Sequence, residues 1–382
     1  MKVNCSRQEL GRGLSIVNHA AGSRSSLPIL SNLLFVAETD KIKLTATNLE
    51  ITITCEIPAT VLEPGSTTVP AKLMNDYINA LTAVETQLES LPGGAHGLRV
   101  RSLGSEANMR GMDPAEYPSR VLIDDNEPSL SLDTNIVKSM IAQTFFAAAT
   151  DDARPVFTSV LARTREGKLT FAAADTFRLA VSNKLTESTD YTVADVLIPA
   201  RSLNELSKIL PSEGIVQCYF STPNRNQVFF KMPGIEFSAQ TSEGQFPNFE
   251  TIIPKETSTR VIVSTDDVRA AIKQALLFSK SDTSSNIVSL IVTPGSHGLT
   301  PGAITLQATN DEFGDARKVI DATVDGPEVT ILFNGKFLAE VLNVLSANQI
   351  VFELNSPQTP GIVKSYGDDS YIHVIMPLYS RR

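Results

Sequence analysis

One short segment occurs three times along the chain, and a spaced internal repeat constrains the fold more than any other feature of a sequence. PAKLMNDYINAL begins at residue 70, PARSLNELSKIL at 199, and a looser copy, NGKFLAEVLNVL, at 334. Each copy carries a cation two residues after its first position: Lys72, Arg201 and Lys336. Apolar residues recur at helical spacing, as at Leu73, Tyr77 and Leu81 or at Leu203, Leu206 and Leu210. This spacing predicts an amphipathic helix in each copy.

Further features recur in the same order. The segment at 6–21, which opens with a capping-box spacing of Ser6 and Glu9, has counterparts at 133–150 and 264–280. KLTATNLEITITC, KLTFAAADTFRLAVS and AITLQATNDEFGDAR each predict a strand, a polar turn with Asn or Asp, and a second strand. The matching order indicates three related units rather than chance similarity.

We therefore expect three domains, at 1–127, 128–254 and 255–382, joined by polar segments that contain proline. The predicted fold class is α+β, with two helices packed on β-sheets in each domain. The predicted helices span 7–21, 70–81, 134–150, 199–210, 265–280 and 334–345.

Composition limits the class of protein. Hydrophobic residues make up 42% and charged residues 20% of the chain, as in ordinary globular proteins, and we expect neither a membrane span nor a signal segment. The three cysteines, Cys5, Cys55 and Cys218, form no pair at metal or disulfide spacing, which favours a reduced cytoplasmic location. The net charge of −9 argues against binding nucleic acid by bulk charge, although one face can still be basic.

Motifs for catalysis are missing from the sequence. The four histidines stand outside metal-binding patterns, and there is neither a phosphate-binding glycine loop nor a nucleophile elbow. The adjacent acidic pairs at 124–125 and 151–152 are typical of solvated loops. We therefore expect a protein that is not an enzyme, with no metal and no cofactor, and whose role is binding or scaffolding.

Positive charge is concentrated in the predicted helices. They carry a net charge of +4, whereas the rest of the chain carries −13. In the fifth helix, Arg269, Lys273 and Lys280 follow one side. If the helices face a common centre, they would attract duplex DNA, which has about one negative charge per 1.7 Å of axis, without reading its sequence. A head-to-tail partner would close such a half ring.

The chain resembles a known family, the bacterial DNA polymerase III beta subunit, or sliding clamp. The resemblance covers the whole length, and it depends on the order of several motifs rather than on any single one. The segments that carry it are MKV…RQEL, SRSSLPILSNLLF, LTATNLEITI, AADTFRLAVS, EGQFPNFETIIP and YIHVIMPL.

The resemblance implies a ring of two identical chains and six similar domains, with helices around the hole and sheets outside. Such a ring is loaded onto double-stranded DNA by a clamp loader and tethers the replicative polymerase, which raises the polymerase concentration near the primer end. Other partner proteins share a pocket between the second and third domains, into which each inserts a short peptide.

The resemblance also places that pocket on particular residues. The matching positions are Arg154, Phe157, Ala174, Thr176, Phe177, Arg178, Leu179, Pro247, Thr251, Ile252, Val374, Met376, Pro377 and Leu378. Residue type alone would assign most of the apolar ones to core packing, and Arg178 is expected to be available to a peptide carboxylate or carbonyl. Two departures predict an altered rim: Thr176-Phe177 replaces a frequent Gly-His, and the chain continues to Arg382.

Two further sets of residues are expected to act in the ring. The residues expected to face DNA are Arg24, Lys72, Arg201, Lys273 and Lys336. Arg24 lies in a loop that resembles a DNA-contacting loop of the family, and the other four are expected from helix geometry. Exposed apolar residues expected at the joint between chains are Met109, Leu277 and Phe278. The alternative interpretation is a repeat-built protein-interaction scaffold that never encircles DNA.

Overall fold

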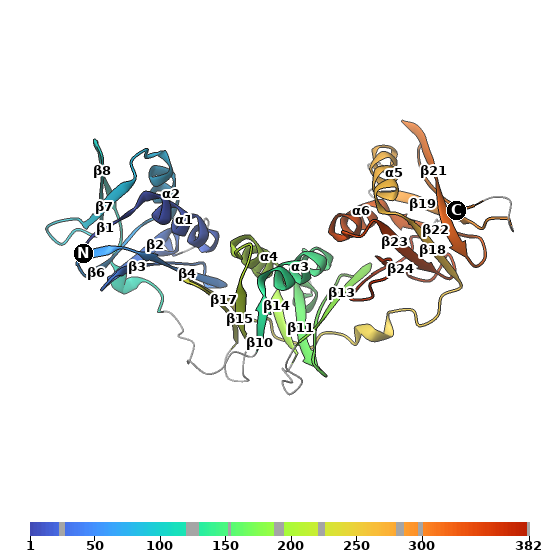
Figure 1. Ribbon diagram of the computed structural model, residues 1–382, viewed down its shortest axis with the longest axis horizontal. Helices are drawn as coiled ribbons and strands as arrows, with labels where there is room; N and C mark the ends of the chain where they lie inside the picture. Colours follow the sequence, from blue (N-terminus) through green and yellow to red (C-terminus); the bar gives the residue numbers. More distant parts are fainter. Residues whose placement is uncertain are drawn as a thin grey trace. The chain divides into compact units, whose positions relative to one another are not determined.

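The computed structural model describes residues 1–22, 27–119, 130–151, 154–186, 195–220, 226–279, 286–296 and 301–379 (Figure 1). The chain divides into two compact units, each made of two segments. The first comprises Met1–Val137 with Arg201–Thr241, and the second comprises Lys138–Ala200 with Ser242–Arg382. Helices α3 (Thr134–Thr144) and α4 (Ala200–Ile209) cross the division.

The first unit is built mainly from antiparallel strands. Its strands are β1 (Lys2–Ser6), β2 (Asn32–Glu38), β3 (Lys41–Thr47), β4 (Ile51–Pro58), β5 (Thr60–Glu63), β6 (Gly65–Pro70), β7 (Glu85–Ser90), β8 (Gly97–Ser102), β9 (Ser105–Arg110), β10 (Leu130–Asp133), β15 (Ile215–Tyr219), β16 (Gln227–Met232) and β17 (Ile235–Gln240). Its helices are α1 (Arg7–Val17) and α2 (Ala71–Ala80), with short 3-10 helices at Asn18–Ala20, Pro28–Ser31 and Pro114–Glu116.

These strands form two sheets, one in the order β5-β1-β7-β8-β9 and one in the order β10-β15-β16-β17-β4-β3-β2-β6. Helix α1 packs on β3 and β4, and α2 lies beside α1 (Figure 1). Burial alternates in the first half of β3 and, except at Thr54, along β4, as expected where one face of a sheet meets helices and the other meets solvent.

The second unit has the same kind of architecture. Its strands are β11 (Ser159–Arg165), β12 (Lys168–Ala174), β13 (Arg178–Leu185), β14 (Val196–Pro199), β18 (Thr259–Ser264), β19 (Ile287–Thr293), β20 (Gly302–Asn310), β21 (Gly314–Asp325), β22 (Val329–Asn334), β23 (Gln349–Leu354), β24 (Gly361–Ser365) and β25 (Tyr371–Ile375). Its helices are α5 (Thr265–Phe278) and α6 (Gly335–Val344), with short 3-10 helices at Phe145–Ala147, Pro155–Thr158 and Phe249–Thr251.

All twelve strands join in one sheet, in the order β14-β11-β12-β13-β25-β24-β23-β18-β21-β20-β19-β22. Helix α5 packs on β20 and β21 and lies beside α6 (Figure 1). The six helices expected from the sequence are therefore present, with ends within a few residues of the predictions except where the first and third continue as 3-10 turns.

Side-chain caps explain where several helices begin. The Ser6 hydroxyl accepts a hydrogen bond from the Glu9 N–H at the start of α1, and Ser264 does the same for Asp267 at the start of α5. The side chain of Asn334 accepts from the Lys336 N–H at the start of α6. Each cap satisfies a backbone donor that the first helical turn leaves unpaired.

The repeated helix buries a common position. Four residues after the first position of each copy stand Met74, Leu203 and Leu338, and all three are fully buried. The predicted stripe of α4, Leu203, Leu206 and Leu210, is also buried.

The predicted stripe of α2 was wrong. Leu73 is 53% exposed, Tyr77 and Leu81 are half-buried, and the buried side chains are Ala71, Met74 and Ile78. Because α2 carries apolar residues on two neighbouring faces, spacing within that one helix did not identify the packed face. Alignment with the other two copies does identify it.

The strand–turn–strand prediction is confirmed in all three repeats, and the turns share a mechanism. Asn48, Asp175 and Asn310 each accept two hydrogen bonds through one side-chain oxygen. The donors are the backbone N–H groups two and three residues later. This arrangement, an Asx turn, reverses the chain before β4, β13 and β21.

The strand after each of two turns also pairs with a strand from the next repeat. Strand β4 pairs with β17, with Ile51 opposite Ala239 and Cys55 opposite Ile235. Strand β13 pairs with β25, with Arg178 opposite Ile375. These ladders continue a sheet from one repeat into the next by backbone hydrogen bonds.

A close approach secures the end of β9 in the first unit. The Thr68 hydroxyl on β6 donates to the Met112 carbonyl at 2.8 Å and accepts from the Met112 N–H at 2.8 Å. Gly111 lies directly against this contact, where a Cβ atom would overlap the Thr68 carbonyl oxygen. A side chain at position 111 is therefore excluded by space.

Candidate functional site

The second unit contains an apolar pocket of about 310 Å³. Its walls come from the 3-10 helix before β11, the turn between β12 and β13, the segment between β17 and β18, and the end of β25. The lining residues are Phe157, Ala174, Asp175, Thr176, Arg178, Leu179, Pro247, Ile252, Val374 and Met376. A concave apolar lining with few polar groups is typical of a site for apolar side chains of a ligand.

Strand pairing places the two walls that are farthest apart in the sequence. Leu179 on β13 lies directly opposite Val374 on β25, so both side chains reach the same face of the sheet. The ladder extends past the strand end, because the Met376 N–H donates to the Phe177 carbonyl at 2.8 Å. Met376 is thus held at the rim by its backbone, while its flexible side chain lines the pocket.

Arg178 is engaged within the protein. Its side chain is 8% exposed, its Nε donates to Asp175 Oδ2 at 3.0 Å, and a second nitrogen donates to the Phe146 carbonyl at 2.6 Å. It also forms an ion pair with Glu340 on α6. The expectation that Arg178 is free for a peptide was therefore wrong, because its side chain is largely buried and three of its five N–H donors are used within the protein.

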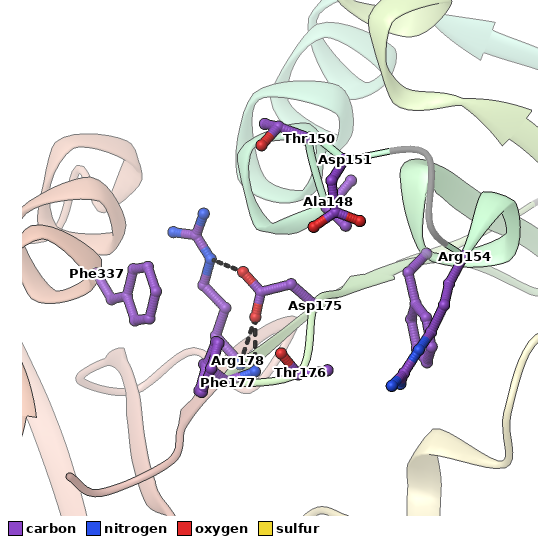
Figure 2. Close-up of a pocket in the computed structure, with 11 residues that line it drawn as sticks. Ala148, Thr150, Asp151, Arg154, Asp175, Thr176, Phe177, Arg178 and Phe337 are labelled. Carbon is purple, nitrogen blue, oxygen red and sulfur yellow. Dashed lines mark hydrogen bonds and ion pairs between the residues drawn. The ribbon is translucent and has the colours of Figure 1, made fainter.

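A second cavity, of about 450 Å³, adjoins the first (Figure 2). The two share Phe157, Asp175, Thr176 and Arg178. The other residues of the second cavity are Ala148, Ala149, Thr150, Asp151, Arg154, Phe177 and Phe337. Figure 2 shows the Arg178 side chain between Asp175 and Phe337, and its guanidinium carbon lies 4.3 Å from the centre of the Phe337 ring.

Eleven of the fourteen residues expected at the pocket line one or both of these cavities. Two of the eleven, Arg154 and Phe177, line the second cavity only. The other three are not among the lining residues of either cavity. The Thr251 hydroxyl donates to the Asn248 carbonyl at 2.7 Å, Pro377 is buried, and the Leu378 N–H donates to Leu332 on β22. The chain after Met376 thus turns away to pair with β22.

Sequence reasoning missed several residues here, among them Phe337 and Glu340 on α6. Both belong to the third copy of the repeated helix, which was considered for its charge and its apolar stripe and not as a wall of the pocket. A signal was available, because Phe337 stands where the other copies have Leu73 and Ser202. The equivalent Leu73 is 53% exposed in the first copy, so an aromatic residue at this position in the third copy indicates a contact specific to the third repeat.

A buried histidine lies near Arg178. His373 on β25 is fully buried, its Nδ1 is 3.1 Å from the Tyr371 hydroxyl, and its ring stacks on Phe146 with centres 5.5 Å apart. Its Nε2 has no hydrogen-bond partner among the described residues. Burial, and secondarily the charge of Arg178, lowers the pKa of His373 to about 3, so the ring is neutral at physiological pH.

The basic residues expected to face DNA have different surroundings. Lys72, Lys273 and Lys336 are exposed on α2, α5 and α6. Arg201 on α4 is exposed too, and its Nε lies 3.4 Å from a Glu50 carboxylate oxygen. Arg24, like Lys280, lies outside the described residues.

The residues expected at the joint between chains fall into two groups. Leu277 is 64% exposed and Phe278 is half-buried, both at the end of α5. Met109 is 3% exposed on β9, so the expectation of an exposed side chain there was wrong. The alternation of β9 directs the Met109 side chain to the buried face, opposite Leu98 on β8.

The described residues contain neither a metal-binding cluster nor a membrane-spanning helix. No cluster of three or more His, Cys, Asp or Glu side chains in that part of the chain is arranged to hold a metal ion. No helix there is long and apolar enough to cross a membrane. The three cysteines are buried and unbonded.

Family models of the DNA polymerase III beta subunit match the chain in order. The N-terminal domain model matches residues 1–122, the central domain model 131–248, and the C-terminal domain model 250–379. The chain belongs to the DNA polymerase III beta subunit family. The expected α+β fold of three clamp domains is therefore confirmed, and as a beta subunit the protein is a non-catalytic component of the polymerase.

Individual beta subunits agree over nearly the whole length. The beta sliding clamp of Synechococcus elongatus is 29% identical over 100% of both chains, and that of Bacillus subtilis is 27% identical over 99% of both. The crystal structure of the Bacillus subtilis clamp superposes with a TM-score of 0.93 at 27% identity, covering 100% of this chain and 99% of that one. The Streptococcus pyogenes beta subunit gives 0.90 at 25% identity, with full coverage of both.

Proposed function

We propose that this protein is a sliding clamp that encircles double-stranded DNA and tethers the replicative polymerase. The observation that carries the proposal is the match to the Bacillus subtilis sliding clamp over the whole chain, in sequence and in fold. Tethering needs no catalytic group, because it acts by keeping the polymerase close to the primer end. A scaffold that never encircles DNA is the less favoured alternative.

The ring is closed by a second copy of the chain, and the repeated strand junction supports this. At two junctions, the strand after an Asx turn pairs with the last strand of the next repeat, as β4 does with β17 and β13 with β25. The equivalent strands left over are β9, at the edge of the first sheet, and the first part of β21, after the third turn. Strand β18 pairs only with Thr323–Asp325 at the end of β21. Head-to-tail pairing of β21 with β9 of a second chain repeats the pattern and closes a ring of two.

The repeat also predicts the register of that pairing. Ile51 and Phe313 each stand three residues after the Asx-turn residue, so Phe313–Arg317 is equivalent to Ile51–Cys55. Ile235 and Ser105 each begin the second strand of a hairpin, β16–β17 and β8–β9, so Ser105–Met109 is equivalent to Ile235–Ala239, which pairs with Ile51–Cys55. Phe313 then lies opposite the backbone of Met109. Phe313 is 61% exposed in the single chain, so the joint would cover it. Leu277 and Phe278 on α5 are the other candidates for this joint.

Ala316 and Glu106 lie opposite each other in this register, and Ala316 is half-buried while Glu106 is exposed. Ala316→Glu is expected to weaken the dimer by placing like charges together, whereas Ala316→Lys, the matched control, keeps it intact. Sedimentation velocity over a concentration series measures both. Equal dimer affinity in the two variants would contradict the register.

DNA would be held by charge without base recognition. The candidate contacts are Arg24, Lys72, Arg201, Lys273 and Lys336. Lys72 and Lys336 lie in the first turns of α2 and α6, Lys273 lies further along α5, and all three lysines are exposed. Arg201 would exchange its contact with Glu50 for phosphate. Because phosphate contacts release counterions, binding through these side chains weakens as salt rises.

The topological claim has a direct test. The protein is loaded onto nicked circular DNA with the clamp loader of the same organism, washed at high salt, and compared with protein on the same DNA after linearisation. An encircling ring stays on the circle and slides off the linear ends, while a charge-bound scaffold leaves both. Equal retention on the two DNAs would refute encirclement.

The apolar pocket is proposed as the site where the polymerase and other partner proteins insert a short peptide. Its volume of about 310 Å³, the adaptable Met376 and the fixed Pro247 suit a few apolar side chains. Since Arg178 is occupied by Asp175 and Glu340, peptide polar groups would be met by backbone or by the rim residue Thr176.

A further inference from the structure

The segment between β17 and β18 forms one wall of the apolar pocket without belonging to a sheet. From Glu243 to Ser258 it contains only one short helix, Phe249–Thr251, and no ladder strand. Pro247 and Ile252 from this segment line the pocket. Its position must therefore come from side-chain contacts rather than from a ladder of backbone hydrogen bonds.

Packing supplies part of that position. Phe249 is 3% exposed and Phe246 is 5% exposed, and both belong to the apolar cluster that includes Leu161, Leu179 and Val374. The rings of Phe246 and Phe249 meet edge to face with centres 6.3 Å apart. Apolar packing is not directional, so it anchors the segment without fixing its orientation.

A buried arginine supplies a directional contact. Arg163 on β11 has a side chain that is 10% exposed, and it donates to both carboxylate oxygens of Asp195 at 2.9 and 2.7 Å. Its remaining terminal nitrogen donates to Glu250 Oε1 at 2.9 Å, and its guanidinium lies 5.4 Å from the centre of the Phe249 ring. The planar guanidinium thus joins the body of the central repeat to the wall segment.

Geometry connects this contact to the pocket. Glu250 lies in the short helix between Pro247 and Ile252, which are three residues before it and two residues after it. Glu250 itself lines neither cavity, and its side chain is 57% exposed. The Arg163–Glu250 contact therefore fixes the short helix that carries the pocket wall, and it does not itself contact a ligand in the pocket.

We propose that Arg163, acting through Glu250, is a positioning residue that holds the Pro247–Ile252 wall in its binding geometry before a partner peptide arrives. The proposal rests on the proposed function of the pocket. A wall that is already ordered spares the peptide the entropic cost of ordering it, so the ion pair contributes to affinity without touching the ligand.

The test uses the full-length protein and the purified replicative polymerase subunit of the same organism as the probe, with binding measured by surface plasmon resonance and unfolding by thermal denaturation. Glu250→Ala is expected to weaken binding about five- to tenfold, on the scale of one ordinary hydrogen bond, because solvent screens the charge of the exposed Glu250. The unfolding midpoint should barely move for the same reason. Glu250→Gln keeps an acceptor and should recover most of the affinity.

The matched control is Arg165→Ala, two residues along β11. Arg165 is 62% exposed and lies 3.6 Å from Asp195. Within the described part of the chain it forms no ion pair with the wall segment, so binding should be unchanged. Arg163→Ala should weaken binding as Glu250→Ala does, and the double variant should weaken it no further. An additive double variant would mean that Glu250 touches the partner directly, which overturns the proposal.

Met376→Ala separates the two possible failures. If Met376→Ala weakens binding and Glu250→Ala does not, the pocket stands and the positioning role of Arg163 is overturned. If Met376→Ala leaves binding unchanged, the pocket is not the partner site and both proposals fall. Affinity that falls only in step with the unfolding midpoint across all variants would make the ion pair merely structural.

Discussion

Lowering the pH from 7.5 to 5.0 should destabilise this protein through His373. The ring is buried, and its pKa of about 3 lies well below the ordinary value of 6.5 for an exposed histidine. Between these values the unfolded chain binds a proton that the folded protein excludes, so the free energy of unfolding falls as the pH drops below 6.5. The charged or titratable neighbours described near the ring are Arg178 and Tyr371, and Arg178 opposes protonation.

The size of the effect follows from the difference in pKa. Each pH unit between the two values is worth about 1.4 kcal/mol, so the loss from His373 at pH 5.0 is about 2 kcal/mol. His373→Gln removes the titrating ring and should remove about that much of the pH dependence. It will also lower stability at pH 7.5, because the Gln side chain does not reproduce the stacking on Phe146.

The assay is urea unfolding followed by far-ultraviolet circular dichroism, since the chain has no tryptophan to report by fluorescence. Wild type, His373→Gln and the control His96→Gln, whose side chain is 46% exposed, are compared at pH 7.5 and 5.0 at one protein concentration. Other groups titrate equally in all three, so their contribution cancels. If wild type and His373→Gln lose the same free energy between the two pH values, the buried neutral histidine is not the cause.

Three other perturbations have expected outcomes. Gly111→Ala should lower the free energy of unfolding by several kcal/mol, because the new Cβ overlaps the Thr68 carbonyl. Gly104→Ala, the control at an open hairpin tip with positive φ, should lower it by about 1 kcal/mol. Equal thermal midpoints of the two variants would contradict this. Arg178→Ala should cost about 3 kcal/mol, because it leaves Glu340 and the largely covered Asp175 carboxylate without their partner. Urea unfolding measures this against Arg165→Ala, which should cost little. The three cysteines, with pKa values raised by burial, should react with a thiol reagent at pH 8 only as fast as the protein opens, and rapid reaction of the native protein would refute their burial.

The repeat made most of the fold predictable. Three copies each of two helices and of a strand–turn–strand unit located the six helices and the turns before β4, β13 and β21, because each copy tests the others. The packed face of α2 was missed when that helix was considered alone. Comparison of Met74 with Leu203 and Leu338 would have found it, since all three are fully buried.

The site was less predictable, for reasons of distance along the chain. Pocket residues came from the resemblance, which places them on matching positions but says nothing about their hydrogen-bond partners. Arg178 meets Glu340 across 162 residues, and Arg163 meets Glu250 across 87. Periodicity describes neighbours within one element, so it carries no information about which charge lies opposite which after folding.

The side chains that form the three Asx turns differ in one atom, and that atom gives the middle turn a second contact. Asn48 and Asn310 present an amide, while Asp175 presents a second oxygen in its place, which accepts from Arg178 at 3.0 Å. The first oxygen still reverses the chain, so the backbone needed no redesign. The turn of the central repeat therefore does two things with one side chain: it reverses the chain, and it orients Arg178 toward Glu340 of the next repeat.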